Sequence, residues 1–270
     1  AQDLGEPDLA EKIADETAQY QGTIFRFVCD GEPMMHPQFL DMLKYAKEKK
    51  ISPICFNTNG MFLTKTMAKE ILKQNIDVIE VSLDAIKKET YERIRKGGNF
   101  EKVTSGIFYL LEQRKKIKSH TKIMVSIIDQ TEAASEIKSF FKFWSPKVDR
   151  VIKRTYTTIG GMVDKGKLKP WDTKERWPCP LPWTRIFINV DGLIKFCVED
   201  WLDKTVVGDL RKINIKTTWA SSEYQLLRES HLARNFDAVD YCGQCLDWSA
   251  RQWNYDYFHA VEQVISEVIK

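Results

Sequence analysis

Residues 78–84 read Val-Ile-Glu-Val-Ser-Leu-Asp, a nearly continuous apolar run that ends in polar side chains. This pattern is typical of a parallel β-strand with both faces covered. Similar runs rich in Val, Ile and Phe recur before residue 155, at 23–29, 54–57, 122–128 and 150–153. Because helix-period segments separate them, the alternation over residues 7–154 predicts right-handed βαβ units on a parallel sheet.

Two of the intervening segments place their apolar residues on one helical stripe: Phe39, Met42, Leu43 and Ala46, and Ile107, Leu110 and Leu111. In parallel α/β proteins the chemistry lies at the carboxyl ends of the strands. Here those ends are polar, with Asp30-Gly31-Glu32, Thr58-Asn59, Ser82 and Asp84, and Ser126 and Asp129. We expect these groups to converge into a cup for a polar ligand.

The chain changes character after residue 154. Glycine and proline punctuate residues 155–182, which predicts a linker. Asp191-Gly192 between two apolar runs predicts a β-hairpin over 185–197. Helices are expected at 217–230 and 255–269.

Four cysteines follow the linker. Cys179 and Cys197 flank the predicted hairpin, and Cys242 and Cys245 form a C-x-x-C. Four thiolates complete the ligand set of a [4Fe–4S] cluster or of a structural zinc, and the spacing leaves both open. Tryptophans near these cysteines are expected to shield the metal from water. The other two cysteines, Cys29 and Cys55, lie in apolar runs and are expected to be core thiols.

Composition limits the classes of function. A net charge of +3 in 270 residues is too small to indicate nucleic acid or membrane as a partner. No apolar run is long enough to span a bilayer, and the acidic, polar first residues do not resemble a signal peptide. We therefore expect a cytoplasmic protein, in which clustered cysteines more often hold metal than form disulfides.

Several segments resemble the radical S-adenosylmethionine (SAM) enzymes. Residues 31–37 (GEPMMHP) look like their "GGEP-LLHP" segment, residues 57–60 (NTNG) are similar to their "TNG" strand end, and residues 81–97 (VSLDAIKKETYERIRKG) resemble their fourth-strand segment. Cys179 to Cys197, with Gly192 between them, then 207–210 (VGDL) and the final C-x-x-C resemble their SPASM/Twitch extension.

The resemblance implies an α/β fold: an incomplete (β/α)6 partial TIM-type barrel followed by a small α+β cluster-binding domain. The expected boundaries are a barrel over 1–158, a linker over 159–178 and an auxiliary cluster domain over 179–270. No cysteine follows Cys245, which favours the smaller Twitch type with one cluster.

The family's C-x3-C-x2-C loop is not found in these 270 residues. The chain therefore resembles an N-terminally shortened member, and a second, SAM-binding [4Fe–4S] cluster is expected only if that loop is present. By themselves, the 270 residues are expected not to cleave SAM.

By resemblance, Gly31 and Glu32 would meet the amino group of SAM, and Ser82 and Asp84 would face its ribose or methionine end. Arg95 would pair with the SAM carboxylate. Each has a plainer alternative: an ordinary strand-to-helix turn at 31–32, helix capping by Asp84, and an exposed helical arginine at 95. Thr58 and Asn59 are expected to shape the turn.

Cys179, Cys197, Cys242 and Cys245 would bind an auxiliary [4Fe–4S] cluster. The implied chemistry is reductive cleavage of SAM, hydrogen abstraction from a small-molecule or peptide substrate, and net oxidation through the auxiliary cluster. An electron donor such as flavodoxin or ferredoxin is expected. The residues do not identify a catalytic side chain. The alternatives are a non-catalytic iron–sulfur electron-transfer module and a zinc-stabilised interaction domain.

Overall fold

The computed structural model describes residues 7–20, 22–28, 31–168, 175–253 and 263. These residues form two compact units, which are described separately. The first unit comprises residues 10–155, and the second comprises 7–9 and the described residues of 156–253. The predicted core thiol Cys29 lies outside the described residues. So does the predicted helix at 255–269, apart from residue 263.

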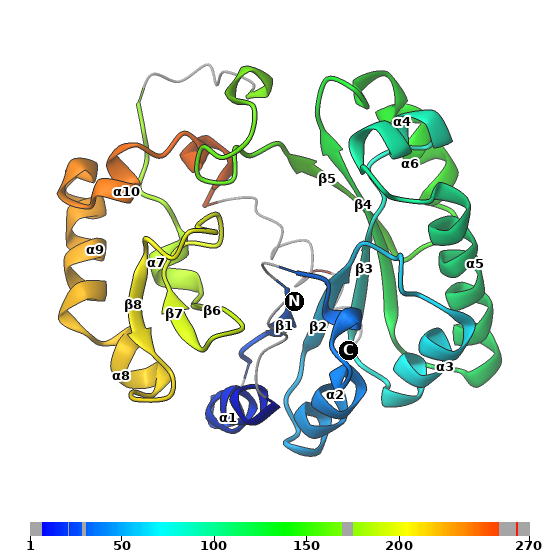
Figure 1. Ribbon diagram of the computed structural model, residues 1–270, viewed down its shortest axis with the longest axis horizontal. Coiled ribbons are helices and arrows are strands. Elements are labelled where there is room, and N and C mark those ends of the chain that lie inside the picture. Colours follow the sequence, from blue (N-terminus) through cyan, green and yellow to red (C-terminus); the bar gives the residue numbers. More distant parts are fainter. Residues whose placement is uncertain (1–6, 21, 29–30, 169–174, 254–262, 264–270) are drawn as a thin grey trace. The chain divides into compact units, whose positions relative to one another are not determined.

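The first unit is built on a five-stranded sheet in the order β1-β2-β3-β4-β5 (Figure 1). All four strand pairs are parallel. The strands are β1 (Phe25–Phe27), β2 (Ile54–Thr58), β3 (Val78–Ser82), β4 (Lys122–Asp129) and β5 (Arg150–Thr155). Because spatial order follows chain order without reversal, the sheet has the singly wound topology of a partial barrel, as predicted.

Helices cover one face of this sheet (Figure 1). They are α2 (Phe39–Glu48), α3 (Lys65–Gln74), α4 (Lys88–Ile94), α5 (Phe100–Ile117) and α6 (Ile137–Trp144). Helix α1 (Pro7–Thr17) precedes β1, and its residues from Ala10 onward belong to this unit. The main core forms between them and the sheet. It includes Phe39 and Leu43 of the predicted stripe on α2 and Leu110 on α5, all at most 1% exposed. Burial of these apolar stripes stabilises the layer.

The opposite face of the sheet has a smaller apolar layer. Cys55, Val78, Met124 and Ile152 form this layer, and each is at most 3% exposed. They belong to four neighbouring strands and share a face because side chains alternate along each strand. Cys55 is therefore a buried core thiol, as its apolar surroundings predicted.

The second unit contains a three-stranded antiparallel sheet in the order β6-β7-β8 (Figure 1). Its strands are β6 (Phe187–Ile188), β7 (Leu193–Lys195) and β8 (Val206–Asp209). Its helices are α7 (Leu181–Thr184), α8 (Ile215–Trp219), α9 (Ser222–Leu232) and α10 (Asp240–Gly243). Short 3-10 turns occur at Pro33–Met35, Ala134–Glu136, Lys165–Lys167, Phe236–Ala238 and Asp247–Ala250 across the two units.

Two features of this unit differ from the sequence prediction. The hairpin is present with its turn at Asp191-Gly192, but β8 extends it to a third strand that was not predicted. The helix expected at 217–230 is two helices, α8 and α9. The Ser221 hydroxyl accepts a hydrogen bond from the Tyr224 backbone N–H at 3.4 Å, so Ser221 starts a new helix where one continuous helix was expected.

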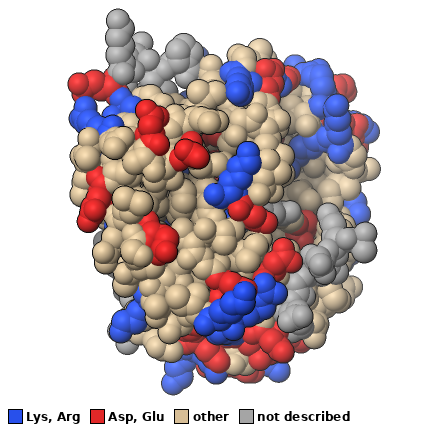
Figure 2. All heavy atoms as spheres, turned by 60° about the vertical axis from the view of Figure 1, so that its left-hand side comes forward, with Lys and Arg blue, Asp and Glu red and all other residues tan. Residues whose placement is uncertain are grey.

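The exterior shows mixed charge. On the face drawn in Figure 2, lysine and arginine side chains are interspersed with aspartate and glutamate. None of the described helices is both long and apolar enough to cross a membrane.

Candidate cofactor sites

The carboxyl-end edge of the first unit's sheet, called the rim below, brings polar residues from successive strands together. After β1, the Glu32 carboxylate accepts hydrogen bonds from the Thr58 hydroxyl at 2.8 Å and the Asn59 backbone N–H at 2.7 Å. A third hydrogen bond comes from the Met34 backbone N–H at 3.3 Å. Glu32 is thus fixed against the end of β2, and Thr58 and Asn59 hold the carboxylate as well as shaping their turn.

Burial raises the pKa of Glu32, although these hydrogen bonds and the charge of Arg95 lower it in part. A carboxylate that is partly desolvated and held by rigid donors forms stronger interactions with a cation than an exposed one does. Glu32 therefore has the chemistry to bind an ammonium group at this edge of the sheet.

Asp84 and Arg95 form an ion pair just beyond β3. The Asp84 carboxylate accepts from the Arg95 Nε at 2.9 Å and Nη2 at 2.6 Å. Its other oxygen accepts from the Ile128 backbone N–H at 3.0 Å. Asp84 has a φ of 58° and is 2% exposed. The N-cap of α4 is Lys87, so Asp84 does not cap that helix.

The other two predicted SAM contacts are less enclosed. Gly31 is exposed, and nothing lies within 4 Å of the position where a Cβ would stand. Ser82, the last residue of β3, is half-buried and pairs in register with Ser126 of β4. The Ser126 hydroxyl is buried and has no hydrogen-bond partner among the described residues. The five predicted SAM residues thus lie at the rim, after β1 and at or after the end of β3. Among them, Asp84 and Arg95 are joined by hydrogen bonds.

Below the rim lies a group that the sequence reasoning missed. Glu80, fully buried in β3, accepts hydrogen bonds from Asn57 Nδ2 at 3.0 Å and Arg154 Nε at 2.9 Å. Arg26 donates to the Asn57 amide oxygen through Nε at 2.9 Å and lies 3.7 Å from Glu80. We call these four residues the buried quartet. The signal in the sequence is Glu80 itself, because a charged residue inside an apolar strand needs a buried partner.

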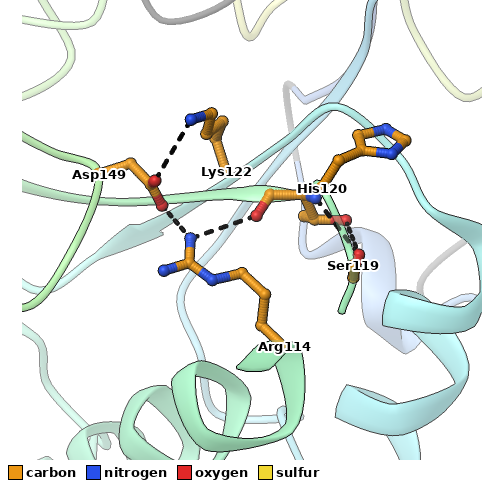
Figure 3. A pocket seen from close by; sticks show the side chains of 6 residues that line it. Arg114, Ser119, His120, Lys122 and Asp149 are labelled. Carbon is orange, nitrogen blue, oxygen red and sulfur yellow. Dashed lines mark hydrogen bonds and ion pairs between the residues drawn. The ribbon is translucent and has the colours of Figure 1, made fainter. Parts of the chain in front are cut away.

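The pocket drawn in Figure 3 is separate from the rim residues proposed to bind SAM. It has a volume of about 310 Å³ and is lined by Arg114, Ser119, His120, Thr121, Lys122 and Asp149. Since Lys122 is the first residue of β4, the pocket lies at the amino end of the strand, away from the rim. Asp149 pairs with Arg114 and lies 3.7 Å from Lys122, so its charges are largely matched internally.

In the second unit, the four predicted ligands come from three places in the chain. Cys179 lies just before α7, Cys197 just after β7, and Cys242 and Cys245 in and after α10. The Cys245 backbone N–H donates to the Cys242 carbonyl at 3.1 Å, which closes the C-x-x-C turn. Cys242 packs with Phe196, Tyr224 and Leu227 in the unit's small core, and Cys197 packs against it.

Burial and neighbouring thiols both act on the pKa values of the four cysteines. Burial, as the largest cause, raises the pKa of all four thiols, that of Cys242 to about 12. The charge of Cys179 further raises the pKa of Cys197, Cys242 and Cys245. Backbone N–H groups donate to two of them, Leu181 to Cys179 and Asp247 to Cys245.

The four thiols do not form a ready-made mononuclear site. Among the described residues, no three His, Cys, Asp or Glu side chains are arranged to hold a metal ion. Four cysteines that share a partly buried region nevertheless form a suitable donor set for an iron–sulfur group once their thiols are deprotonated.

Two residues beside Cys179 were missed. The His231 Nδ1 accepts the Cys179 backbone N–H at 3.1 Å, and His231 is 1% exposed. Burial, with a smaller effect of the Arg176 charge, lowers the pKa of His231 to about 4. Arg176 stacks over Phe236. His231 is 52 residues from Cys179, so no local sequence signal predicted this contact.

Comparisons with known proteins assign the class. The family model described as the Radical SAM superfamily matches residues 2–143, just over half of the chain. A second, described as an iron-sulfur cluster-binding domain (SPASM), matches residues 179–246.

This chain belongs to the radical SAM superfamily and is a radical SAM/SPASM iron–sulfur protein. The sequence resemblance is thereby confirmed, including the cofactors that the two families imply, SAM and [4Fe–4S].

The curated relatives either match a short segment of this chain or match a longer part at low sequence identity. The GTP 3',8-cyclase of Limosilactobacillus fermentum is 36% identical over 81 residues, which are 30% of this chain and 24% of that protein. The probable GTP 3',8-cyclase of Methanocaldococcus jannaschii is 26% identical over 204 residues, 63% of this chain and 67% of that protein. This chain therefore spans about a quarter of the first relative's length and about two thirds of the second's.

Solved structures share the fold. BtrN in complex with AdoMet and 2-DOIA matches with a TM-score of 0.61 and 15% identity, covering 93% of this chain and 85% of that one. Streptococcus suis SuiB bound to precursor peptide SuiA matches with a TM-score of 0.67 and 14% identity, covering 82% and 60%. At these identities the likeness shows the α/β fold alone, as predicted from the sequence.

Proposed function

We propose that this protein is a radical SAM enzyme whose rim binds SAM and whose four C-terminal cysteines hold an auxiliary [4Fe–4S] cluster. The observation that supports it most is the match of residues 179–246, which contain Cys179, Cys197, Cys242 and Cys245, to an iron-sulfur cluster-binding domain. In the structure Cys197 packs against the small core that contains Cys242. Buried thiolates repel one another, and an iron–sulfur core that they ligate compensates much of their charge.

The match of residues 179–246 to a family model described as an iron-sulfur cluster-binding domain favours the cluster over zinc. A tetrahedral zinc with Zn–S bonds of about 2.3 Å holds its thiolates about 3.8 Å apart. A cubane places one thiolate on each of four irons, so its ligands stand farther apart. Among the described residues the four thiols form no mononuclear metal site, which agrees with the larger core.

For SAM, the proposed contacts are Gly31, Glu32, Ser82, Asp84 and Arg95. The Glu32 carboxylate would bind the ammonium group of the methionine end, supported by its fixed position and partial burial. Arg95, already oriented by Asp84, would face the SAM carboxylate. On one-electron reduction, SAM supplies the radical that abstracts hydrogen from a substrate; the three-cysteine loop that this step needs is not in the printed residues.

The substrate is proposed to be a small molecule or a peptide. Relatives carry the name GTP 3',8-cyclase, and structures of similar fold are complexes with 2-DOIA or with a precursor peptide, so both classes occur on this architecture. A cluster with four cysteine ligands leaves no iron open to substrate, which favours electron transfer and net oxidation over Lewis-acid chemistry. A low-potential one-electron protein such as flavodoxin or ferredoxin would be the donor.

Anaerobic purification tests this proposal. The wild-type protein should be brown and absorb near ~400 nm, and single Cys→Ser changes at 179, 197, 242 or 245 should each reduce iron content and absorbance. Cys55→Ser is the matched control, since Cys55 is buried in the other unit. A colourless protein with one zinc per chain would instead support the zinc-stabilised interaction domain.

A further inference from the structure

Arg176 lies three residues before Cys179, with its side chain packed against an aromatic ring. Its guanidinium carbon is 4.0 Å from the centre of the Phe236 ring. Within the described part of the chain, its buried Nε has no hydrogen-bond partner and its guanidinium forms no ion pair with a carboxylate. Arg176 as a whole is half-buried, and a partly desolvated guanidinium without an anionic partner is costly unless something else compensates its charge.

The surrounding rings connect Arg176 to Cys179. Phe236 packs edge-to-face with His231, with centroids 5.2 Å apart. The His231 Nδ1 then accepts the Cys179 backbone N–H. Because Nδ1 accepts, the ring is neutral and its proton is on Nε2. The positive charge of this stack is therefore that of Arg176.

The charge of Arg176 acts on most of the thiol group. It lowers the pKa of Cys179, Cys242 and Cys245, although burial is the larger effect and raises all three. Arg251 also acts on Cys179 and Cys197, but it forms an ion pair with Glu199. Arg176 thus acts on three of the four proposed ligands and is linked to Cys179 through Phe236 and His231, and it pairs with no carboxylate among the described residues.

We propose that Arg176 is a positioning residue that sets the reduction potential of the auxiliary cluster. The inference rests on the proposed function, since it requires the cluster. A [4Fe–4S] core with four thiolates is anionic and gains one negative charge on reduction. A partly buried positive charge nearby therefore stabilises the reduced form more than the oxidised form and raises the potential.

The test is a dye-mediated redox titration of anaerobically reconstituted protein, monitored by absorbance and electron paramagnetic resonance. Arg176→Gln should shift the midpoint potential to a lower value with iron content unchanged, while Arg176→Lys, which keeps the charge, should stay near wild type. Arg234→Gln is the matched control. Arg234 is an exposed arginine of the same unit that pairs with Glu175, and its removal should leave the potential unchanged.

A second neutral variant guards against misfolding. Arg176→Met retains an apolar stem that packs on Phe236, and it should show the same downward shift as the Gln variant. Full iron content with a wild-type potential in both neutral variants would overturn the inference. Loss of iron from both, with retention in Arg176→Lys, would also overturn it, because the charge would then serve assembly. Wild-type protein that binds no iron would refute the proposed function itself.

Discussion

The Glu32 carboxylate accepts a hydrogen bond from the Thr58 hydroxyl at 2.8 Å. The two residues belong to separate sequence segments, 31–37 and 57–60, that each resemble radical SAM enzymes. Neighbouring parallel strands bring both segments to the same edge of the sheet. The proposed ammonium-binding carboxylate is therefore oriented by the strand beside it, and each segment depends on the other.

Replacing Glu32 tests its proposed role in SAM binding. Glu32→Gln keeps the size and one acceptor oxygen but removes the charge that would pair with the ammonium group. Loss of a charge-assisted hydrogen bond should weaken SAM binding roughly ten- to hundredfold, measured by isothermal titration calorimetry. Glu70→Gln, at an exposed pair with Lys73, should bind like wild type. Unchanged affinity in Glu32→Gln would contradict the assignment.

The raised pKa of Glu32 predicts a pH dependence. Only the ionised carboxylate pairs with the ammonium group, so SAM affinity should fall as the pH falls through this pKa. The decline should begin at a higher pH than an ordinary glutamate would give. Calorimetry at a series of mildly acidic pH values measures this dependence. In Glu32→Gln the SAM affinity should not show this decline with falling pH. Identical curves for both proteins would count against the proposal.

The glycine pair in the second unit predicts a difference between two alanine variants. Gly160 has a φ of 61°, and a Cβ there would overlap the Tyr241 hydroxyl. Gly161 has a φ of 91°, but its nearest neighbour is the flexible Lys165 side chain at 3.6 Å. Gly160→Ala should lower the free energy of unfolding by about 2–4 kcal/mol, and Gly161→Ala by only about 1 kcal/mol from backbone strain.

Urea denaturation followed by tryptophan fluorescence measures this difference. Equal losses in the two variants would show that the Tyr241 hydroxyl, which donates to the Glu199 carbonyl at 2.9 Å, moves aside without cost.

The buried quartet predicts a strong effect on the first unit. Glu80→Gln would leave the guanidinium groups of Arg26 and Arg154 without the buried carboxylate that both approach. Breaking such a pair should destabilise the fold by about 2–4 kcal/mol, with some relief because Arg154 is 30% exposed. Chemical denaturation gives the value. Glu70→Gln should change stability by less than about 1 kcal/mol, and a similarly small loss at Glu80 would show that the quartet adds little stability.

The sequence predicted the features that depend on local patterns. Apolar runs such as 78–82 gave the parallel strands, and Asp191-Gly192 gave the hairpin, because both follow from neighbouring residues. The four cysteines were recognisable by residue type and spacing.

Features that depend on contacts across the chain were not predicted. Glu80 meets Arg154 across 74 residues, and Cys179 meets His231 across 52. The break between α8 and α9 was missed because Ser221 is compatible with a continuous helical pattern in the sequence. In the structure its hydroxyl accepts a backbone N–H and starts a new helix. Strand β8 is only four residues long and half-exposed, so its pairing with β7 left little periodic signal.

The most direct test of the central claim is Mössbauer spectroscopy of the chain reconstituted anaerobically with ⁵⁷Fe, combined with iron and sulfide analysis. The account predicts about four irons and four sulfides per chain in a [4Fe–4S] spectrum, abolished when Cys242 and Cys245 are both serine. A wild-type chain that binds no iron, or whose iron signal survives the double substitution, would contradict it.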